Sequence, residues 1–153
     1  MASQVVSTAS GLSRADVAFP AHADASRFLA PLGRFLFAAI FLLAAPGHFT
    51  RATIAYAAQQ GVPLASFAVP LSGVLALAGG LSVLLGYRAR LGAWLLVLFL
   101  VPVTVMLHNF WAVSDPMMHQ LQQVMFLKNL ALIGGALFIA QAGAGPFSLD
   151  ARR

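Results

Sequence analysis

Four long apolar stretches, separated by short polar segments, constrain the fold of this chain more than any other feature. The stretches cover residues 31–49, 63–85, 91–108 and 116–141. Each has about the 20 residues that a helix needs to cross roughly 30 Å of hydrocarbon. Because lipid offers no hydrogen-bond partners, each segment must pair its backbone groups internally and therefore be helical. The sequence predicts an all-α integral membrane protein, a four-helix bundle with up-down-up-down connectivity.

Composition supports the membrane assignment and excludes several kinds of chemistry. Of the 153 residues, 60% are hydrophobic and only 8% are charged, whereas a soluble domain carries roughly 25% charged residues. The chain contains no cysteine, which excludes disulfides, thiolate metal sites and cysteine nucleophiles. The formal charge of +5 comes from basic residues scattered at segment ends. We therefore expect lipid headgroups, and no nucleic acid, as their partners.

The distribution of basic residues predicts the orientation of the bundle. Four spans place both termini on one side of the membrane, and that side holds most of the basic residues, namely Arg14, Arg27, Arg34, Arg88, Arg90, Arg152 and Arg153. The other side holds only Arg51 and Lys128. Because cytoplasmic loops carry an excess of Lys and Arg, we expect both termini in the cytoplasm. Residues 1–27 are predicted to be a mobile cytoplasmic tail, and residues 28–150 to form the four-helix domain.

Local signals mark the ends and the contacts of the predicted helices. Gly86 is predicted to cap the C-terminus of the second span, and Asp115, followed by a proline, to begin the fourth. Small residues recur every four positions at Ser72, Ala76 and Gly80, a spacing that lets helix backbones approach closely. We expect this contact within one bundle, although a homo-oligomer would use the same pattern.

One lysine lies inside the fourth apolar stretch. Lys128 and its neighbour Asn129 interrupt a run of otherwise apolar residues. A charge within hydrocarbon costs roughly 2.5–3.5 kcal/mol on insertion scales, so it persists by snorkelling to the interface, by pairing, or by facing a polar cavity. An amide cannot snorkel far. We expect Asn129 to hydrogen-bond another helix, either in a structural contact or as part of a ligand site.

Further polar residues fall on the same predicted outer side. His108 and Trp111 lie on one face where the third span ends, and the first span also ends in a histidine. His119, Gln122 and Asn129 recur at helical spacing along the fourth span. If these three spans converge at their outer ends, they form an outward-opening pocket with apolar walls. The candidate ligand-binding residues are His48, His108, Asn109, Trp111, His119, Gln122, Lys128 and Asn129.

Each of these residues also has a structural explanation. Trp111 suits the aromatic belt at a membrane interface, and histidines at helix ends, such as His48 and His108, interact favourably with the helix dipole. Spacing does not support a metal site built from the histidines. No acid lies within the central spans, which argues against a relay of buried carboxylates. No residue is assigned a catalytic role, and whether the protein is an enzyme stays open.

Short motifs run through the four spans in the order Pro46-Gly47-His48-Phe49, Gly61-Val62-Pro63, Gly79-Gly80-Leu81, His108-Asn109-Phe110-Trp111 and Phe126-Leu127-Lys128-Asn129-Leu130. In this order and spacing the chain resembles the DoxX-like family of small four-helix bacterial membrane proteins. The resemblance implies a multi-pass protein of the bacterial inner membrane, linked to quinone-dependent oxidation of reduced sulfur or to redox-stress complexes. Many relatives carry a glutamate where this chain has Ala76 and a lysine where it has His48, so no role is expected to depend on those two groups.

Two functions are compatible with the predicted pocket. The first, implied by the resemblance, is an accessory subunit of a quinone-linked redox system. A quinone head would then be bound by His108, Asn109, Trp111, Lys128 and Asn129. A redox partner protein or a bound cofactor would supply the electrons. The second is a non-enzymatic scaffold, or a binder or carrier of a small apolar or anionic molecule that pairs with Lys128. In a third interpretation the polar residues only hold the bundle together.

Overall fold

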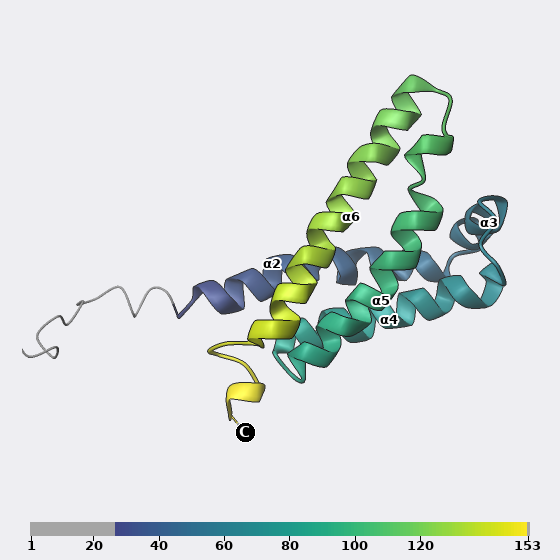
Figure 1. Ribbon diagram of the computed structural model, residues 1–153. Coiled ribbons are helices and arrows are strands. Elements are labelled where there is room, and N and C mark those ends of the chain that lie inside the picture. Colours follow the sequence, from purple (N-terminus) through teal and green to yellow (C-terminus); the bar gives the residue numbers. More distant parts are fainter. Residues whose placement is uncertain (1–26, 153) are drawn as a thin grey trace, which may run out of the picture.

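The computed structural model describes residues 27–152, and every regular element in that range is a helix. Four of these helices are long and apolar enough to cross a membrane (Figure 1). The predicted all-α membrane fold is therefore confirmed. The predicted N-terminal tail lies, apart from Arg27, outside the described residues.

The first span is longer than one regular α-helix, and a short helix follows it. The elements in chain order are α2 (Leu29–Ala44), the 3-10 turn η1 (Ala45–Phe49), α3 (Arg51–Gln59), α4 (Ala65–Leu85), α5 (Ala89–Leu107), η2 (Phe110–Ala112), α6 (Pro116–Ala142) and η3 (Asp150–Arg152). The sequence pattern predicted no helix between residues 49 and 63, where the structure has α3. This helix starts at an N-cap, since Thr50 Oγ1 accepts the Thr53 N–H at 3.3 Å.

The four spans pack in the order α2, α4, α5 and α6, and α3 packs on α4 and η1. Figure 1 shows α5 and α6 leaning away from α2 and α4 toward the end of the molecule where α5 connects to α6. The core lies where the spans are closest. It contains Phe41 of α2, Ala76 of α4, Leu96 and Leu100 of α5, and Ala136 of α6.

Small residues allow α4 and α5 to approach closely. A Cβ added at Gly79 would lie 2.8 Å from Leu96 Cδ2, and one added at Gly92 would lie 3.1 Å from the carbonyl oxygen of Gly79. Gly80 faces α2 instead, where an added Cβ would lie 3.0 Å from Leu42 Cδ2. The glycines of α4 thus serve contacts within the bundle, where close backbone approach replaces the hydrophobic driving force that lipid removes.

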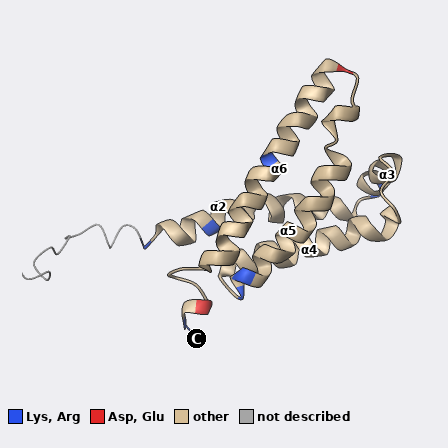
Figure 2. Cartoon of the chain, viewed as in Figure 1, with Lys and Arg blue, Asp and Glu red and all other residues tan. Residues whose placement is uncertain are grey.

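Most of the basic residues gather at the end of the bundle where the C-terminus lies (Figure 2). By the positive-inside rule this end faces the cytoplasm, and we call it the inner end. The opposite end, with α3 and the connection between α5 and α6, is the outer end. At the inner end residues 143–152, the C-terminal segment, fold back and pair with the turn between α4 and α5.

Arg34 binds the C-terminal segment to α2. Its side chain is only 5% exposed. Nη1 donates to the carbonyl oxygens of Ala144 and, at 3.2 Å, Pro146, and Nη2 donates to the carbonyl oxygen of Phe147 at 2.6 Å. The sequence predicted Arg34 only as a topology signal. The structure shows that it also donates to carbonyl groups of a non-helical segment, which has no helical hydrogen bonds to pair them.

Asp150 joins the same segment to α5. Its carboxylate accepts the backbone N–H groups of Arg88 at 2.8 Å and Ala89 at 3.1 Å. A distant carboxylate therefore caps the first turn of α5, where unpaired N–H groups and the helix dipole favour negative charge. Gly86 ends α4 as predicted, with φ of 62°, and an added Cβ there would lie 2.3 Å from Ser148 Cβ. Glycine is needed at this turn for both reasons.

Replacing Arg34 by methionine removes the donor for the three carbonyl oxygens of the C-terminal segment. We expect the Arg34→Met variant to lose at least about 1.5–3 kcal/mol of unfolding free energy, the usual value for a hydrogen bond to a charged group. Thermal unfolding in detergent micelles, followed by circular dichroism, measures this loss. Arg152→Met is the control, because Arg152 is an exposed cation at the same end. Equal losses in the two variants would contradict the assigned role of Arg34.

Candidate functional site

Five of the eight candidate residues meet where α5 connects to α6. His108 ends α5, Asn109 precedes η2, Trp111 lies within η2, and His119 and Gln122 lie in the first two turns of α6. Two aromatic rings, Phe110 and Phe126, join them. We call this group of seven residues the outer corner.

Local sequence signals build the outer corner. Asp115 caps α6 as predicted, since its Oδ1 accepts the Met118 N–H at 2.8 Å, and Pro116 occupies the first helical position, where its missing N–H is not needed. Before it, the Ala112 N–H donates to the carbonyl oxygen of Asn109 at 2.9 Å, which closes η2. These two short-range structures turn the chain sharply enough for the start of α6 to face the end of α5.

Polar groups of the outer corner form hydrogen bonds with residues at this same end of α5 and α6. His108 Nδ1 lies 2.7 Å from Gln122 Oε1. An amide oxygen only accepts, so the ring nitrogen is the donor of this hydrogen bond. His119 Nδ1 lies 3.4 Å from the carbonyl oxygen of Val113. Within residues 27–152 no three His, Asp or Glu side chains lie close enough to share a metal ion. The His108–Gln122 bond links α5 to α6.

The aromatic rings of the outer corner pack on one another. The ring centroids of Phe110 lie 5.2 Å from Trp111, 5.4 Å from His119 and 5.5 Å from Phe126, and Trp111 lies 5.8 Å from Phe126. All four contacts are edge-to-face, the favoured geometry for such pairs. These aromatic rings were predicted to form the apolar walls of a pocket. In the structure they contact one another.

The three remaining candidate residues lie elsewhere. His48 belongs to η1, where its ring lies 5.5 Å from Phe99. Asn129 is 4% exposed, and its amide forms no hydrogen bond with another residue of the described range. Lys128 is on the exposed side of α6, with Nζ 3.4 Å from Met125 Sδ. The eight residues predicted to share one pocket are therefore distributed over four places.

A different cavity lies next to His48. It has a volume of about 410 Å³ and is enclosed by η1, α3, α4 and α5. We call it the lateral cavity. Its wall is mostly apolar, with His48, Thr53 and Ser72 as the polar residues. Ligand sites of proteins typically have about 300–1,000 Å³ and an apolar lining with few polar groups, so the lateral cavity fits that description.

A proline in α5 helps to shape the lateral cavity. Pro102 and Leu98 both line it, and a proline inside a helix cannot donate to the carbonyl four residues earlier. No role in a site was predicted for Pro102 from the sequence. Thr53 and Ser72 were also missed, because the positions that bring them to the cavity depend on how α3 packs on α4.

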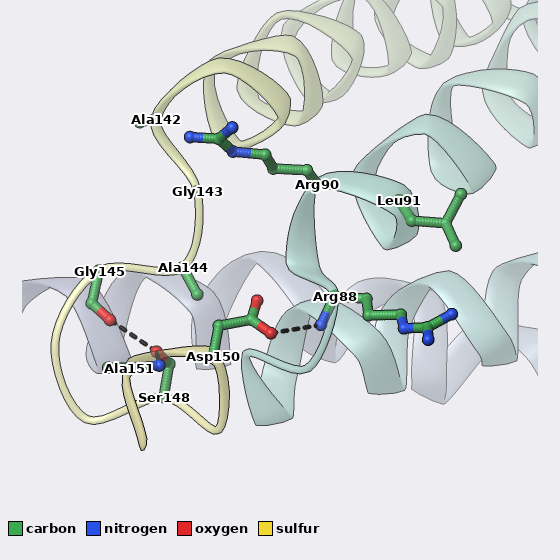
Figure 3. A pocket seen from close by; sticks show the side chains of 10 residues that line it. All are labelled: Arg88, Arg90, Leu91, Ala142, Gly143, Ala144, Gly145, Ser148, Asp150 and Ala151. Atoms are coloured by element: carbon green, nitrogen blue, oxygen red, sulfur yellow. Dashed lines mark hydrogen bonds between the residues drawn. The ribbon is translucent and has the colours of Figure 1, made fainter. Parts of the chain in front are cut away.

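The inner end has a hollow of about 560 Å³ beside the C-terminal segment (Figure 3). Arg88, Arg90 and Asp150 are the charged residues that line it. Figure 3 shows the two guanidinium groups pointing away from each other, with that of Arg90 beside Gly143. The Asp150 carboxylate between them caps α5. Because the cations diverge around a carboxylate, we assign this hollow to the packing of the C-terminal segment.

The fold and these cavities define a small helical membrane protein with four spans. Comparison with known proteins assigns the family: residues 53–153 match the SURF4 family, and the chain belongs to it. The Escherichia coli inner membrane protein YqjF is 31% identical over 121 residues, which cover 78% of this chain and 87% of YqjF. The Escherichia coli inner membrane protein YphA is 27% identical over 100 residues, 65% of this chain and 71% of YphA.

A eukaryotic relative covers a smaller part. The ER-derived vesicles protein ERV29 of Saccharomyces cerevisiae is 30% identical over 80 residues, which are 52% of this chain and 26% of ERV29. No solved structure matches. The predicted location, the bacterial inner membrane, is confirmed by the two Escherichia coli relatives.

The predicted DoxX-like membership is wrong, because the chain belongs to the SURF4 family. The predicted role beside a quinone-linked redox system rested on that resemblance and is wrong as well, and nothing supports the redox partners. The structure explains the misassignment. Gly79, Gly80 and Gly86 are present because backbones cross closely and a turn needs positive φ. Any small four-helix membrane protein has these needs, so the motifs do not identify one family.

The hydrogen bond between His108 and Gln122 predicts a difference between two adjacent glutamines. Gln122→Leu breaks this bond and should lower the unfolding free energy by about 0.5–1.5 kcal/mol. Gln123→Leu is the control, because Gln123 is exposed on α6 and should have little effect. Both are measured by thermal unfolding in micelles. Equal destabilisation would show that the bond does not hold α5 and α6 together.

Asn129→Leu should stabilise the protein. The Asn129 side chain is 4% exposed, but its amide atoms are not among the fully buried atoms without a partner in residues 27–152. Its desolvation therefore costs at most the value for a fully buried amide, about 1–3 kcal/mol, and an apolar side chain of similar size removes that cost. We expect the midpoint of thermal unfolding to rise in the variant, whereas Asn129→Asp should lower it. A fall in the midpoint of Asn129→Leu would mean that the amide has a partner, such as a bound water.

Proposed function

We propose that this protein is a lipid receptor of the inner membrane, which holds an acyl chain in the lateral cavity. The observation that carries the proposal is the cavity itself, about 410 Å³ of mostly apolar space inside the membrane-spanning part of the fold. The cavity has a mostly apolar lining, which offers water few hydrogen-bond partners and favours an apolar occupant. Its lining gains dispersion contacts only when an apolar group fills it.

The position of the lateral cavity favours an occupant from the bilayer. Leu71 of α4 and Leu98 of α5 line it and are 43% and 59% exposed, so they lie at its rim on the membrane-facing surface. The molecule outside this rim is a lipid tail. An acyl chain can therefore enter between α4 and α5 without crossing water, which makes it the most accessible apolar ligand.

Short helix α3 gives the proposed ligand a direction. Thr53 of α3 and His48 of η1 supply polar groups to the cavity, and Ala57 of α3 is buried against α4. Among residues 27–152, Arg51, at the start of α3, is the only arginine at the outer end. A lipid with its tail in the cavity would place its headgroup near α3, where hydrogen-bond donors and a cation suit a phosphate.

The relatives are named for membranes, namely the Escherichia coli inner membrane and, for ERV29, ER-derived vesicles. A receptor that takes its ligand from the bilayer suits each of these locations. This agreement supports the proposal without identifying the lipid.

Filling part of the cavity should weaken lipid retention. The variant is Ala68→Phe, because Ala68 lines the lateral cavity and the added ring occupies part of it. The chain is reconstituted in phosphatidylethanolamine–phosphatidylglycerol vesicles that contain a phosphatidylethanolamine with a photoactivatable acyl chain. Mass spectrometry of the labelled peptides then maps the contacts. We expect labelling of cavity residues in the unmodified chain and about a tenfold decrease in Ala68→Phe, as for a loss of ~1.4 kcal/mol in binding.

The matched control is Val74→Phe, which adds the same ring on α4 at an exposed position that does not line the cavity. It should label like the unmodified chain, and circular dichroism checks that both variants fold. Uniform labelling of all lipid-facing helices, or an equal decrease in both variants, would rule out a specific acyl-chain site.

A further inference from the structure

We propose that the exposed face of α6 around Lys128 docks a membrane-spanning helix of a different protein, and that this helix presents a carboxylate to Lys128. The proposal does not depend on the lateral cavity. It rests on the exposure of α6, on the depth of Lys128 and on the distribution of acids in the chain.

Helix α6 is the least buried of the four spans. Only 11% of its most apolar window is buried, compared with 33% for α4 and for α5. Exposed residues at helical spacing beside Lys128 are Leu121, Val124, Ala131 and Phe138. Gly135, on the same side of α6, instead packs against Phe37 of α2, since a Cβ added there would lie 2.9 Å from Phe37 Cε2. A Cβ added at the adjacent Gly134 would meet no atom within 4 Å. Small residues at this level leave room for another helix backbone.

Lys128 lies deep within α6. It follows Pro116, the first residue of α6, by 12 positions, or about 18 Å along the helix, and precedes Ala142, the last, by 14 positions, or about 21 Å. Its ammonium group contacts Met125 Sδ at 3.4 Å, and a thioether is only a weak acceptor. The described residues offer Lys128 no carboxylate. A cation at this depth favours a partner that can accept a charge-assisted hydrogen bond.

Residues 27–152 of a second copy of this chain have no acid at the depth of Lys128. The protein has four acids, Asp16, Asp24, Asp115 and Asp150. The first two precede the first span, Asp115 caps the start of α6 about 20 Å from Lys128, and Asp150 lies at the inner end. When two copies are inserted with the same orientation, their Lys128 side chains lie at the same depth in the membrane. No acid of residues 27–152 lies at that depth. Charge complementarity therefore points to a different protein with an Asp or Glu in the outer half of a membrane-spanning helix.

Association with synthetic helices tests the charge requirement. The labelled full-length chain in phosphatidylcholine vesicles is mixed with Leu/Ala membrane-spanning peptides that carry Asp or Leu at the level of Lys128. Fluorescence energy transfer measures association. We expect the Asp peptide to associate about tenfold more strongly than the Leu peptide, and this preference to persist in Lys128→Arg and disappear in Lys128→Met. A Lys-bearing peptide should associate with Lys128→Asp.

Cross-linking in native membranes tests the surface. A photoreactive residue at Val124 should cross-link a protein whose sequence has an Asp or Glu in the outer half of a spanning helix, and Lys128→Met should abolish this product. Leu130 is the control position, because it is 48% exposed but points away from Lys128 on α6. Both sites lie outside the lateral cavity, so a failure here leaves the lipid receptor proposal intact.

Three results would overturn the inference. Equal association of the Asp and Leu peptides would show that Lys128 does not recognise a carboxylate. Lys128-dependent energy transfer between two labelled copies would assign the face to a homo-oligomer. Reaction of Lys128 with a membrane-impermeant amine reagent, without any peptide preference, would mean that the side chain reaches the lipid headgroups.

Discussion

The need to pair every backbone polar group inside hydrocarbon underlies this structure. The spans meet that need by being helical, and the exceptions occur where helices end. At the inner end the C-terminal segment has no regular structure between residues 143 and 149, yet Arg34 donates to three of its carbonyl groups and Asp150 accepts two N–H groups of α5. Two charged side chains thus do at this end what hydrogen bonds along a helix do elsewhere.

Close packing at the inner half and looser packing at the outer half follow from the distribution of small residues. Gly79 and Gly92 bring the backbones of α4 and α5 together. Toward the outer end the helices diverge, and larger side chains such as Leu75 and Met106 surround the lateral cavity. The same two helices therefore form both the tightest contact of the bundle and the wall of its best candidate site.

The two cationic side chains within the spans, Arg34 and Lys128, have different surroundings. Arg34 is buried and forms hydrogen bonds with carbonyl oxygens of its own chain. Lys128 is exposed, and its contact is the sulfur of Met125. From the sequence, Arg34 was predicted only as a topology signal, and Lys128 as a charge within a span. Only the fold separates a cation that stabilises this chain from one suited to a partner outside it.

The sequence alone determined the four helices and their approximate ends and predicted their orientation, because length, apolarity and basic residues act locally and lipid permits few other structures. The helix caps Gly86 and Asp115 could also be predicted from the sequence, since each cap depends on residues only a few positions away. The sites were not. Helical spacing aligned Gln122 with Asn129, but only the crossing of α5 and α6 decided that Gln122 meets His108 while Asn129 is buried without a partner. The lateral cavity likewise exists because α3 folds onto α4, a contact between faces whose positions no single helix specifies.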